Sequence, residues 1–145
     1  MLDNPNALVY YSLSALMHSK GGLSRMHFDS NRPIWLQVMG DLEISIVTGR
    51  RQPGEKLPGG RDLAQAYGIN PNTAVRVYQE LEKGGLCETR RGLGTFVTED
   101  AARIATLRTE LARQAVQDFT NRLSTLGVSR EEAARMILEE EENHA

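Results

Sequence analysis

Apolar residues recur every three or four positions through the middle of the chain, the spacing that places them on one face of a helix. The first such stretch is "PIWLQVMGDLEISIVTG". Its leading proline suits a first helical turn, and its final glycine suits the position just past a helix end. Its apolar positions lie four apart: Ile34, Val38, Leu42 and Ile46. The pattern predicts an amphipathic helix over residues 33–48.

Two shorter helical stretches follow, separated by the turn "GIN". The first, "RDLAQAYG", predicts a two-turn helix with Leu63, Ala66 and Tyr67 on its inner side. The second, "NPNTAVRVYQELEKGG", opens with Asn70, a residue type that caps helices well, and with Pro71, which suits the first helical position. Before them, the loop "RRQPGEKLPGG" leaves room for only a very short strand at residues 56–57.

The helix that follows Asn70 has one apolar and one polar face. At about 100° per residue, its buried face consists of Ala74, Val77, Tyr78 and Leu81. The opposite face carries Asn72, Arg76, Gln79 and Lys83, with Thr73 at its edge. Two helices joined by a glycine-containing turn, the second with a polar outer face, are typical of a helix-turn-helix. Asparagine can bind adenine, arginine can bind guanine, and a threonine methyl group can contact thymine.

The segment "LCETRRGLGTFVT" predicts a β-hairpin directly after that helix. Strand-like runs at residues 86–90 and 95–98 flank a glycine-containing connection at residues 91–94. Arg90 and Arg91 would then contact phosphates or enter a minor groove. Taken alone, a polar helix face or an arginine pair in a turn is usually just solvated. The order of the elements is what favours a winged helix that binds DNA.

The tail, residues 99–145, shows a second long apolar stripe. It consists of Ile104, Leu107, Leu111, Ala115, Phe119, Leu123 and Leu126. Gly127 ends this helix, and "SREE" at residues 129–132 is a capping box that starts another. The stripe can pack on the chain's own winged helix or on a second copy. About 45 residues cannot bury it alone. We therefore predict a homodimer that uses the following residues: Ile104, Leu107, Leu111, Phe119 and Leu123.

Charge and length add little to this picture. The 145 residues suffice for about one domain or a small domain with an appendage. The net charge of −2 divides into +1 for residues 1–27, +1 for residues 28–98 and −4 for residues 99–145. The acidity therefore lies in the tail, and charge alone neither predicts nor excludes a nucleic-acid partner. Residues 1–27 are either the product of an upstream start codon, with Met26 just before the organised part, or an extra helix on the body.

The sequence contains no sign of a membrane span, secretion or catalysis. No stretch approaches the ~20 apolar residues of a membrane helix, and the early run "LVYYSLSALM" lacks a basic leader. The single cysteine, Cys87, fits the reducing cytoplasm and is interpreted as a structural thiol rather than a redox sensor. The three histidines lack metal-ligand spacing, and no nucleophilic or phosphate-binding motif is present. We expect no enzyme activity, no metal and no cofactor.

The stretch from about residue 33 to residue 97 closely resembles the N-terminal winged helix of GntR-family bacterial transcription regulators. The resemblance rests on the proline-led first helix, "G..QPGEKLP", "RDLA", "G.N.NT" and the closing "R.G.GTFV". "NPNTAVRVYQELE" followed by a short helical tail is similar to the YtrA-type subgroup, whose members lack a large effector-binding domain. Two departures are Pro71, where many members place an arginine, and the pair Gly59 and Gly60, where a serine cap is common.

The resemblance implies a mainly helical fold: a winged helix-turn-helix over residues 28–98, with three helices and a hairpin wing, and a two-helix dimerisation tail. It also implies roles at matching positions. Arg61 would contact the DNA backbone or an adjacent base, and Asn70, Asn72, Thr73 and Arg76 would read bases, while Arg91 and Gly92 form the wing tip.

The function implied is a repressor that binds an inverted repeat in double-stranded DNA as a homodimer and commonly controls transporter operons. The sequence identifies no effector. The alternative is a winged helix used as a protein-interaction module, with Asn72 and Arg76 merely exposed.

Overall fold

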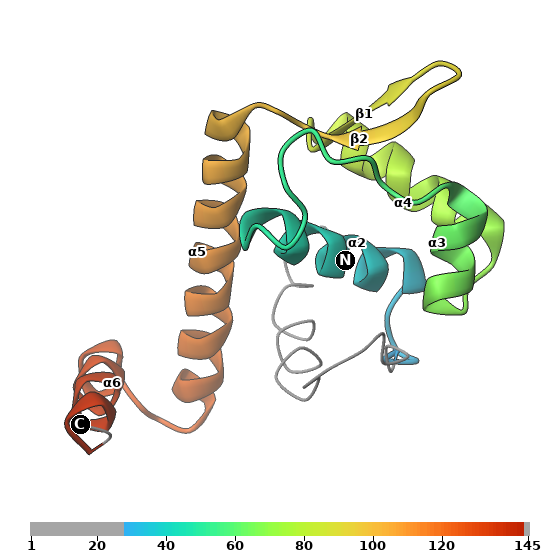
Figure 1. Ribbon diagram of the computed structural model, residues 1–145. Helices are drawn as coiled ribbons and strands as arrows, with labels where there is room; N and C mark the ends of the chain where they lie inside the picture. The colour runs from blue at the N-terminus through green and yellow to red at the C-terminus, as the bar shows by residue number, and fades with distance from the viewer. Residues whose placement is uncertain (1–27, 144–145) are drawn as a thin grey trace.

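The computed structural model describes residues 28–143, and the expectations for residues 1–27 lie outside the described part (Figure 1). The predicted fold is confirmed: three helices and a hairpin form a winged helix, and two helices follow. The elements are α2 Ile34–Val47, α3 Gly60–Tyr67, α4 Pro71–Lys83, β1 Cys87–Arg90, β2 Gly94–Val97, α5 Ala101–Thr125 and α6 Arg130–Asn143. None of the helices within residues 28–143 is long and apolar enough to cross a membrane.

Local capping explains where the two helices of the helix-turn-helix begin and end. The Asn70 side chain accepts a hydrogen bond of 2.8 Å from the Asn72 N–H, and Pro71 occupies the first turn of α4. α3 ends at Gly68, which has a φ of 66°, a left-handed conformation that glycine adopts without a steric penalty. The turn between α3 and α4 is therefore determined by residues that the sequence shows directly.

The core lies where α2, α3 and α4 meet beneath the hairpin. Its fully buried side chains are Val38, Leu42, Leu63, Val77, Leu81, Leu86 and Val97. One inward position was predicted wrongly: Ala64 is buried and Ala66 is exposed. The reason is rotation, because Leu63, Ala64 and Tyr67 span one side of α3 and Ala66 lies roughly 110° from its centre at 100° per residue.

The wing is a two-stranded antiparallel hairpin in which Cys87 pairs with Val97 and Arg90 with Gly94. The very short strand predicted before α3 is present as a single bridge between Lys56 and Phe96. The Leu57 N–H also donates to the Thr95 carbonyl at 2.8 Å. The loop that precedes α3 is therefore hydrogen-bonded to the wing strand β2.

α5 runs past α2 and continues away from the winged helix (Figure 1). Leu107 and Leu111 are buried in the same core cluster as the winged helix, and Ile104 packs against that cluster. This differs from their predicted role in dimerisation. The first turns of α5 cover the apolar side of α2. These three side chains therefore pack against the winged helix of their own chain.

α6 lies at the far end of α5 (Figure 1). Ser129 Oγ accepts a hydrogen bond of 3.1 Å from the Glu132 N–H, which is the Ser129 half of the predicted capping box. Of the side chains of α6 up to Glu140, Ala133 is buried, and the larger apolar ones remain exposed. α6 is therefore only lightly packed on its own chain.

A cluster of charges joins the winged helix to α5. Arg103 Nε donates to the Gly84 carbonyl at 2.7 Å, and its Nη1 lies 3.5 Å from Glu110 Oε2. Glu43 of α2 faces this pair. Burial raises the pKa of Glu43 from its ordinary value of 4.5 to about 7, with Arg103 lowering it and Glu110 raising it further. The junction therefore contains a carboxyl group that titrates near neutral pH.

We expect Glu43→Gln to remove a pH dependence of stability. Between pH 4.5 and about 7 the folded chain keeps a proton that the unfolded chain has released, so stability falls as pH rises through this window. Glutamine stays neutral at every pH. At pH 8 the free energy of unfolding of the variant should therefore be about 2–3 kcal/mol higher than that of the wild type. Urea denaturation at pH 4.5 and pH 8 measures this. Parallel pH profiles for both proteins would contradict it.

Candidate nucleic-acid interface

The outer face of α4 carries the side chains that the sequence predicts to read bases. Asn72 is exposed, and its side chain makes no hydrogen bond within residues 28–143. Thr73 is half-buried at the edge of this face. The carbonyl oxygen of the Asn70 side chain is occupied by the cap, which leaves its amide nitrogen to reach outward. Asn72 therefore has the freer side-chain amide of the two asparagines at the start of α4.

Arg76 lies differently from the prediction. Its guanidinium carbon is 4.1 Å from the centroid of the Trp35 ring, a cation–π contact with the first turn of α2. The side chain is exposed, but it leans back towards α2 instead of extending straight out from α4. Its role in reading bases stays a prediction. Sequence patterns do not predict this stacking, because Trp35 lies 41 positions before Arg76 in the chain.

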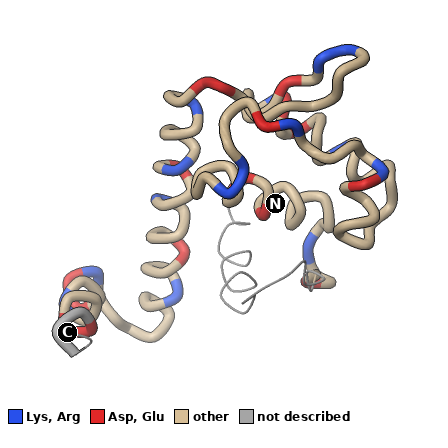
Figure 2. The backbone as a smooth tube through the Cα atoms, in the orientation of Figure 1, with Lys and Arg blue, Asp and Glu red and all other residues tan. Residues whose placement is uncertain are grey.

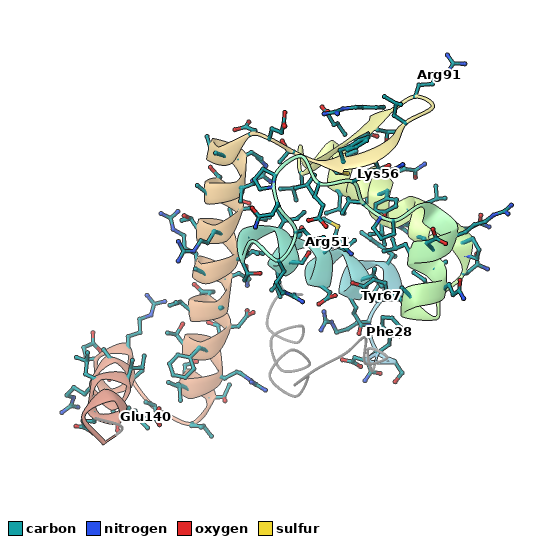
Figure 3. All side chains as sticks on the ribbon, in the orientation of Figure 1. Phe28, Arg51, Lys56, Tyr67, Arg91 and Glu140 are labelled. Carbon is teal, nitrogen blue, oxygen red and sulfur yellow. The ribbon has the colours of Figure 1, made fainter. Side chains whose placement is uncertain are left out.

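The two arginines of the wing have different environments. Arg90 Nε donates to Glu88 Oε1 at 2.6 Å, and its guanidinium carbon lies 4.5 Å from the centroid of the Phe96 ring. Arg91 projects from the tip of the hairpin, away from the body of the domain (Figure 3), and has no ion pair within the described residues. Arg91 is thus the wing arginine whose charge is available to a phosphate.

Basic positions gather at the tip of the hairpin (Figure 2). Gly92, beside Arg91, has a φ of 78°, and a Cβ added there would meet nothing within 4 Å. The glycine is therefore needed for the turn conformation rather than for space in the free protein. It also lets the backbone of the tip approach a groove closely.

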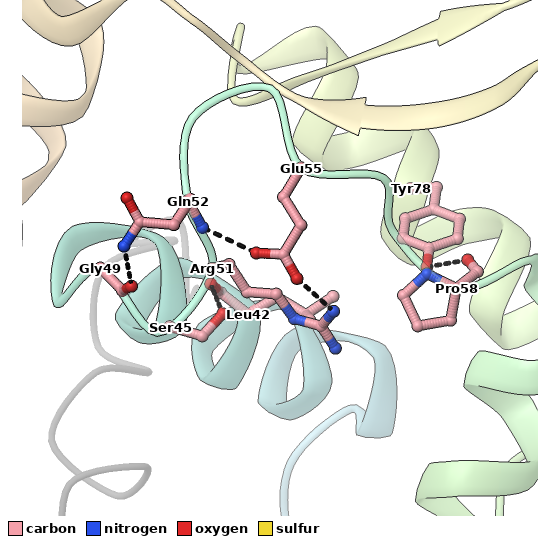
Figure 4. Close-up of polar contacts among 8 residues, drawn as sticks. All are labelled: Leu42, Ser45, Gly49, Arg51, Gln52, Glu55, Pro58 and Tyr78. Carbon is pink, nitrogen blue, oxygen red and sulfur yellow. Dashed lines mark hydrogen bonds and ion pairs between the residues drawn. The ribbon is translucent and has the colours of Figure 1, made fainter.

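Arg61 is exposed in the first turn of α3, and Gly59 provides no side-chain cap, as expected from its sequence. Beside it, α3, α4 and the hairpin border an open hollow of about 700 Å³. Its lining includes Arg51, Lys56, Gly59, Gly60, Tyr78 and Thr95. Arg51 is paired with Glu55 at 3.4 Å, and the Tyr78 hydroxyl donates to the Pro58 carbonyl (Figure 4).

Lys56 is a basic residue of this surface that the sequence analysis did not single out. It is exposed, has no ion pair within residues 28–143, and lies beside Gly94 of the wing. In the sequence, Lys56 belongs to the very short strand predicted at residues 56–57. The bridge that this segment forms with Phe96 brings Lys56 to the wing. Lys56 beside β2 and Arg91 at the tip therefore give the hairpin two positive charges that form no ion pair within residues 28–143.

Cys87 lies behind the interface and not on it. Its thiol is buried, and its sulfur lies 3.7 Å from the Tyr78 carbonyl oxygen. Burial, reinforced by Glu82, raises its pKa to about 11, so the group is a protonated thiol at neutral pH. This agrees with the interpretation of Cys87 as structural. No cluster of three or more potential metal ligands occurs among the described residues.

Comparison with known proteins decides the family. The sequence profile described as "Bacterial regulatory proteins, gntR family" matches residues 35–97. The chain is 39% identical over 105 residues to the uncharacterized HTH-type transcriptional regulator YhcF of Bacillus subtilis, covering 72% of this chain and 87% of that protein. The chain belongs to the GntR family.

Two further relatives support the same assignment. The HTH-type transcriptional repressor YtrA of Bacillus subtilis is 42% identical over 72 residues, covering 50% of this chain and 55% of that protein. The solved structure of a GntR family transcriptional regulator from Listeria monocytogenes superposes with a TM-score of 0.72 at 36% identity, covering 77% of this chain and 98% of that one. The similarity to YtrA agrees with the predicted YtrA-type subgroup.

This GntR-family chain is a DNA-binding transcriptional regulator, and its relatives are regulators, not enzymes. In winged helices of the helix-turn-helix class, the second helix of the motif enters the major groove. That helix is α4 here. The start of α3, the outer face of α4 and the wing carry the residues whose contacts with DNA stay a prediction: Arg61, Asn70, Asn72, Thr73, Arg76, Arg90, Arg91 and Gly92.

Proposed function

We propose that the protein is a sequence-specific repressor that binds an inverted-repeat operator as a homodimer in the bacterial cytoplasm. One observation carries the proposal. The exposed face of α4 and the uncompensated Arg91 belong to one winged helix, while the tail attached to it leaves a large apolar surface uncovered. The first feature suits a half-site of DNA, and the second suits a partner that supplies the other half.

The uncovered surface lies on the far end of α5 and on α6. We call it the distal apolar surface, and it consists of the exposed side chains Val116, Leu126, Met136, Ile137 and Leu138 together with the half-buried Phe119 and Leu123. Val116 is 61% exposed and Leu126 is 75% exposed. Exposed apolar surface of this extent on a small protein marks an interaction site. Phe119 and Leu123, two of the predicted dimerisation residues, belong to it.

A second copy of the chain is the partner that fits best. Two-fold dimers are the commonest oligomers, and helix-turn-helix proteins use them to bind two half-sites of an operator. The distal apolar surface lies away from α4 and the wing (Figure 1), so a copy docked there leaves both DNA-reading surfaces free. The relative YtrA is described as a repressor, which supports repression here. Control of a transporter operon is part of this proposal.

Selection of a random duplex library on the purified full-length protein, with sequencing of the retained DNA, tests the proposal. Recovery of an inverted repeat with two matched half-sites is the expected result, because a two-fold dimer presents two copies of α4. Retention of DNA without any shared sequence would contradict base reading. If the protein retains no DNA in a salt-dependent way, the winged helix is better explained as a protein-interaction module.

We expect Arg91→Ala to weaken binding to operator and random DNA by the same factor. A single phosphate contact contributes to affinity without reading sequence, so the slope of log K against log salt should become shallower by about one unit per site. Anisotropy titrations at several salt concentrations measure both quantities. Arg90→Ala is the matched control and should change the slope less, because Glu88 already neutralises Arg90. Equal slopes for the two variants would contradict this assignment.

A further inference from the structure

Val75 is the exposed aliphatic side chain of α4. It is 48% exposed, whereas Ala74 and Val77 on either side of it are buried. An isolated exposed valine is common on protein surfaces and by itself needs no explanation. The position of this one on the helix gives it meaning.

The side of α4 on which Val75 lies is defined by the wing. Glu82, seven residues further along the helix, accepts a hydrogen bond of 2.9 Å from the Thr89 N–H of β1. Residues seven apart lie roughly 20° from each other around a helix, so Val75 and Glu82 share one edge. Val75 therefore lies on the wing side of the outer face of α4.

Arg76 lies on the other side. It is rotated by about 100° from Val75, and its guanidinium stacks on Trp35 of α2 at 4.1 Å. The exposed amides Asn72 and Gln79 lie between Val75 and Arg76 around the helix, roughly 60° and 40° from Val75. Arg76 belongs to the same outer face, on the side towards α2.

A valine between two amides has a definite use in a major groove. Thymine is the base that presents a methyl group there, and apolar side chains recognise it by contact. Valine is stiff in a helix because its branched Cβ leaves one favoured rotamer, so little side-chain freedom is lost when it binds. Longer neighbouring amides can bind the donor and acceptor groups of adjacent bases.

We propose that Val75 is a specificity-determining residue that contacts the C5 methyl group of one thymine in each half-site. This inference rests on the proposed function, because it requires an operator that the protein reads. It adds Val75 to the residues of α4 that are predicted to read bases.

The test uses the full-length protein and an operator obtained by the library selection. Each thymine is replaced in turn by deoxyuridine, which lacks only the C5 methyl group. One thymine per half-site should be sensitive, with affinity falling about four-fold for each such methyl group removed, the value expected for about one buried carbon group. Val75→Ala, whose side chain is too short to reach the methyl group, should bind the thymine and deoxyuridine duplexes equally.

Arg76→Ala is the matched control, because it changes the neighbouring exposed residue of the same helix. Its overall affinity should fall, because Arg76 is a predicted DNA contact, but the ratio between its affinities for the thymine and deoxyuridine duplexes should match that of the wild type. Thermal unfolding of both variants verifies that α4 is intact, as expected for substitutions to alanine at exposed helical positions. Persistent sensitivity in Val75→Ala, or loss of it in Arg76→Ala, overturns the inference.

The two levels of the proposal fail in different ways. A wild-type protein that selects an operator but ignores every deoxyuridine replacement overturns only the role of Val75. A wild-type protein that selects no common sequence overturns the proposed function and this inference together.

Discussion

The double variant Val116→Glu/Leu126→Glu should be monomeric and should bind its operator about 10²- to 10⁴-fold more weakly than the wild type, the usual gain from joining two binding modules. Both side chains are well exposed on the single chain, so two charges there cost the folded monomer little. In the proposed dimer the same charges would be buried without partners, which is strongly unfavourable. Sedimentation velocity and operator titration at one salt concentration measure the two effects.

A control with the same added charge separates the interface from general repulsion. Gln117→Glu/Asn121→Asp places two carboxylates on α5 at exposed positions that hydrogen-bond to each other at 2.9 Å. These positions lie roughly 100–140° around the helix from Val116. This control should remain dimeric. A dimeric Val116→Glu/Leu126→Glu protein with full operator affinity would show that the two copies meet elsewhere.

The monomeric variant should also discriminate less well between operator and random DNA, because it binds only one half-site. Its winged helix is unaltered, so affinity for random DNA should change less than affinity for the operator. The loss should therefore appear mainly as reduced discrimination between the two kinds of DNA. A uniform loss on both would indicate a damaged winged helix instead of a separated dimer.

The helix-turn-helix was predictable because its determinants are local. A cap such as Asn70 acts on a backbone N–H two residues away, and Gly68 supplies its own left-handed turn. The apolar period of α4 likewise depends only on neighbours along the helix. Strand pairing in the wing was predictable for the same reason, because a short connection joins the two strands.

The failures concern contacts between segments far apart in sequence. The stripe of α5 showed that Leu107 and Leu111 must be covered, but a period does not identify the covering partner, which is the winged helix itself. The stacking of Arg76 on Trp35 is equally invisible to a helical wheel. The exposure of Val75 could be predicted from a helical wheel, since Val75 falls outside the apolar arc of α4. Its place on the same side of α4 as Glu82 became meaningful only through the contact between Glu82 and Thr89 of the wing.

Leu81→Ala should produce the largest loss of stability among single alanine substitutions in α4, about 2–5 kcal/mol. Its side chain is completely buried in the core. Alanine would leave a cavity between α4 and the elements that hold it, and small domains have only about 5–15 kcal/mol of stability in total. Urea denaturation without DNA, at one fixed protein concentration, measures the loss, since dimerisation makes stability depend on concentration.

Leu93→Ala is the matched control for this loss, because it removes the same atoms from a leucine that is 63% exposed in the wing. Its unfolding free energy should stay within about 0.5 kcal/mol of the wild type, the usual range for surface substitutions. A loss as large as that of Leu81→Ala would mean that the wing contributes to the core through Leu93. The contrast matters for function because the buried face of α4 positions the outer face that is predicted to read DNA. Leu81→Ala should therefore reduce operator binding through the fraction of folded protein, and saturating operator should restore the folded state.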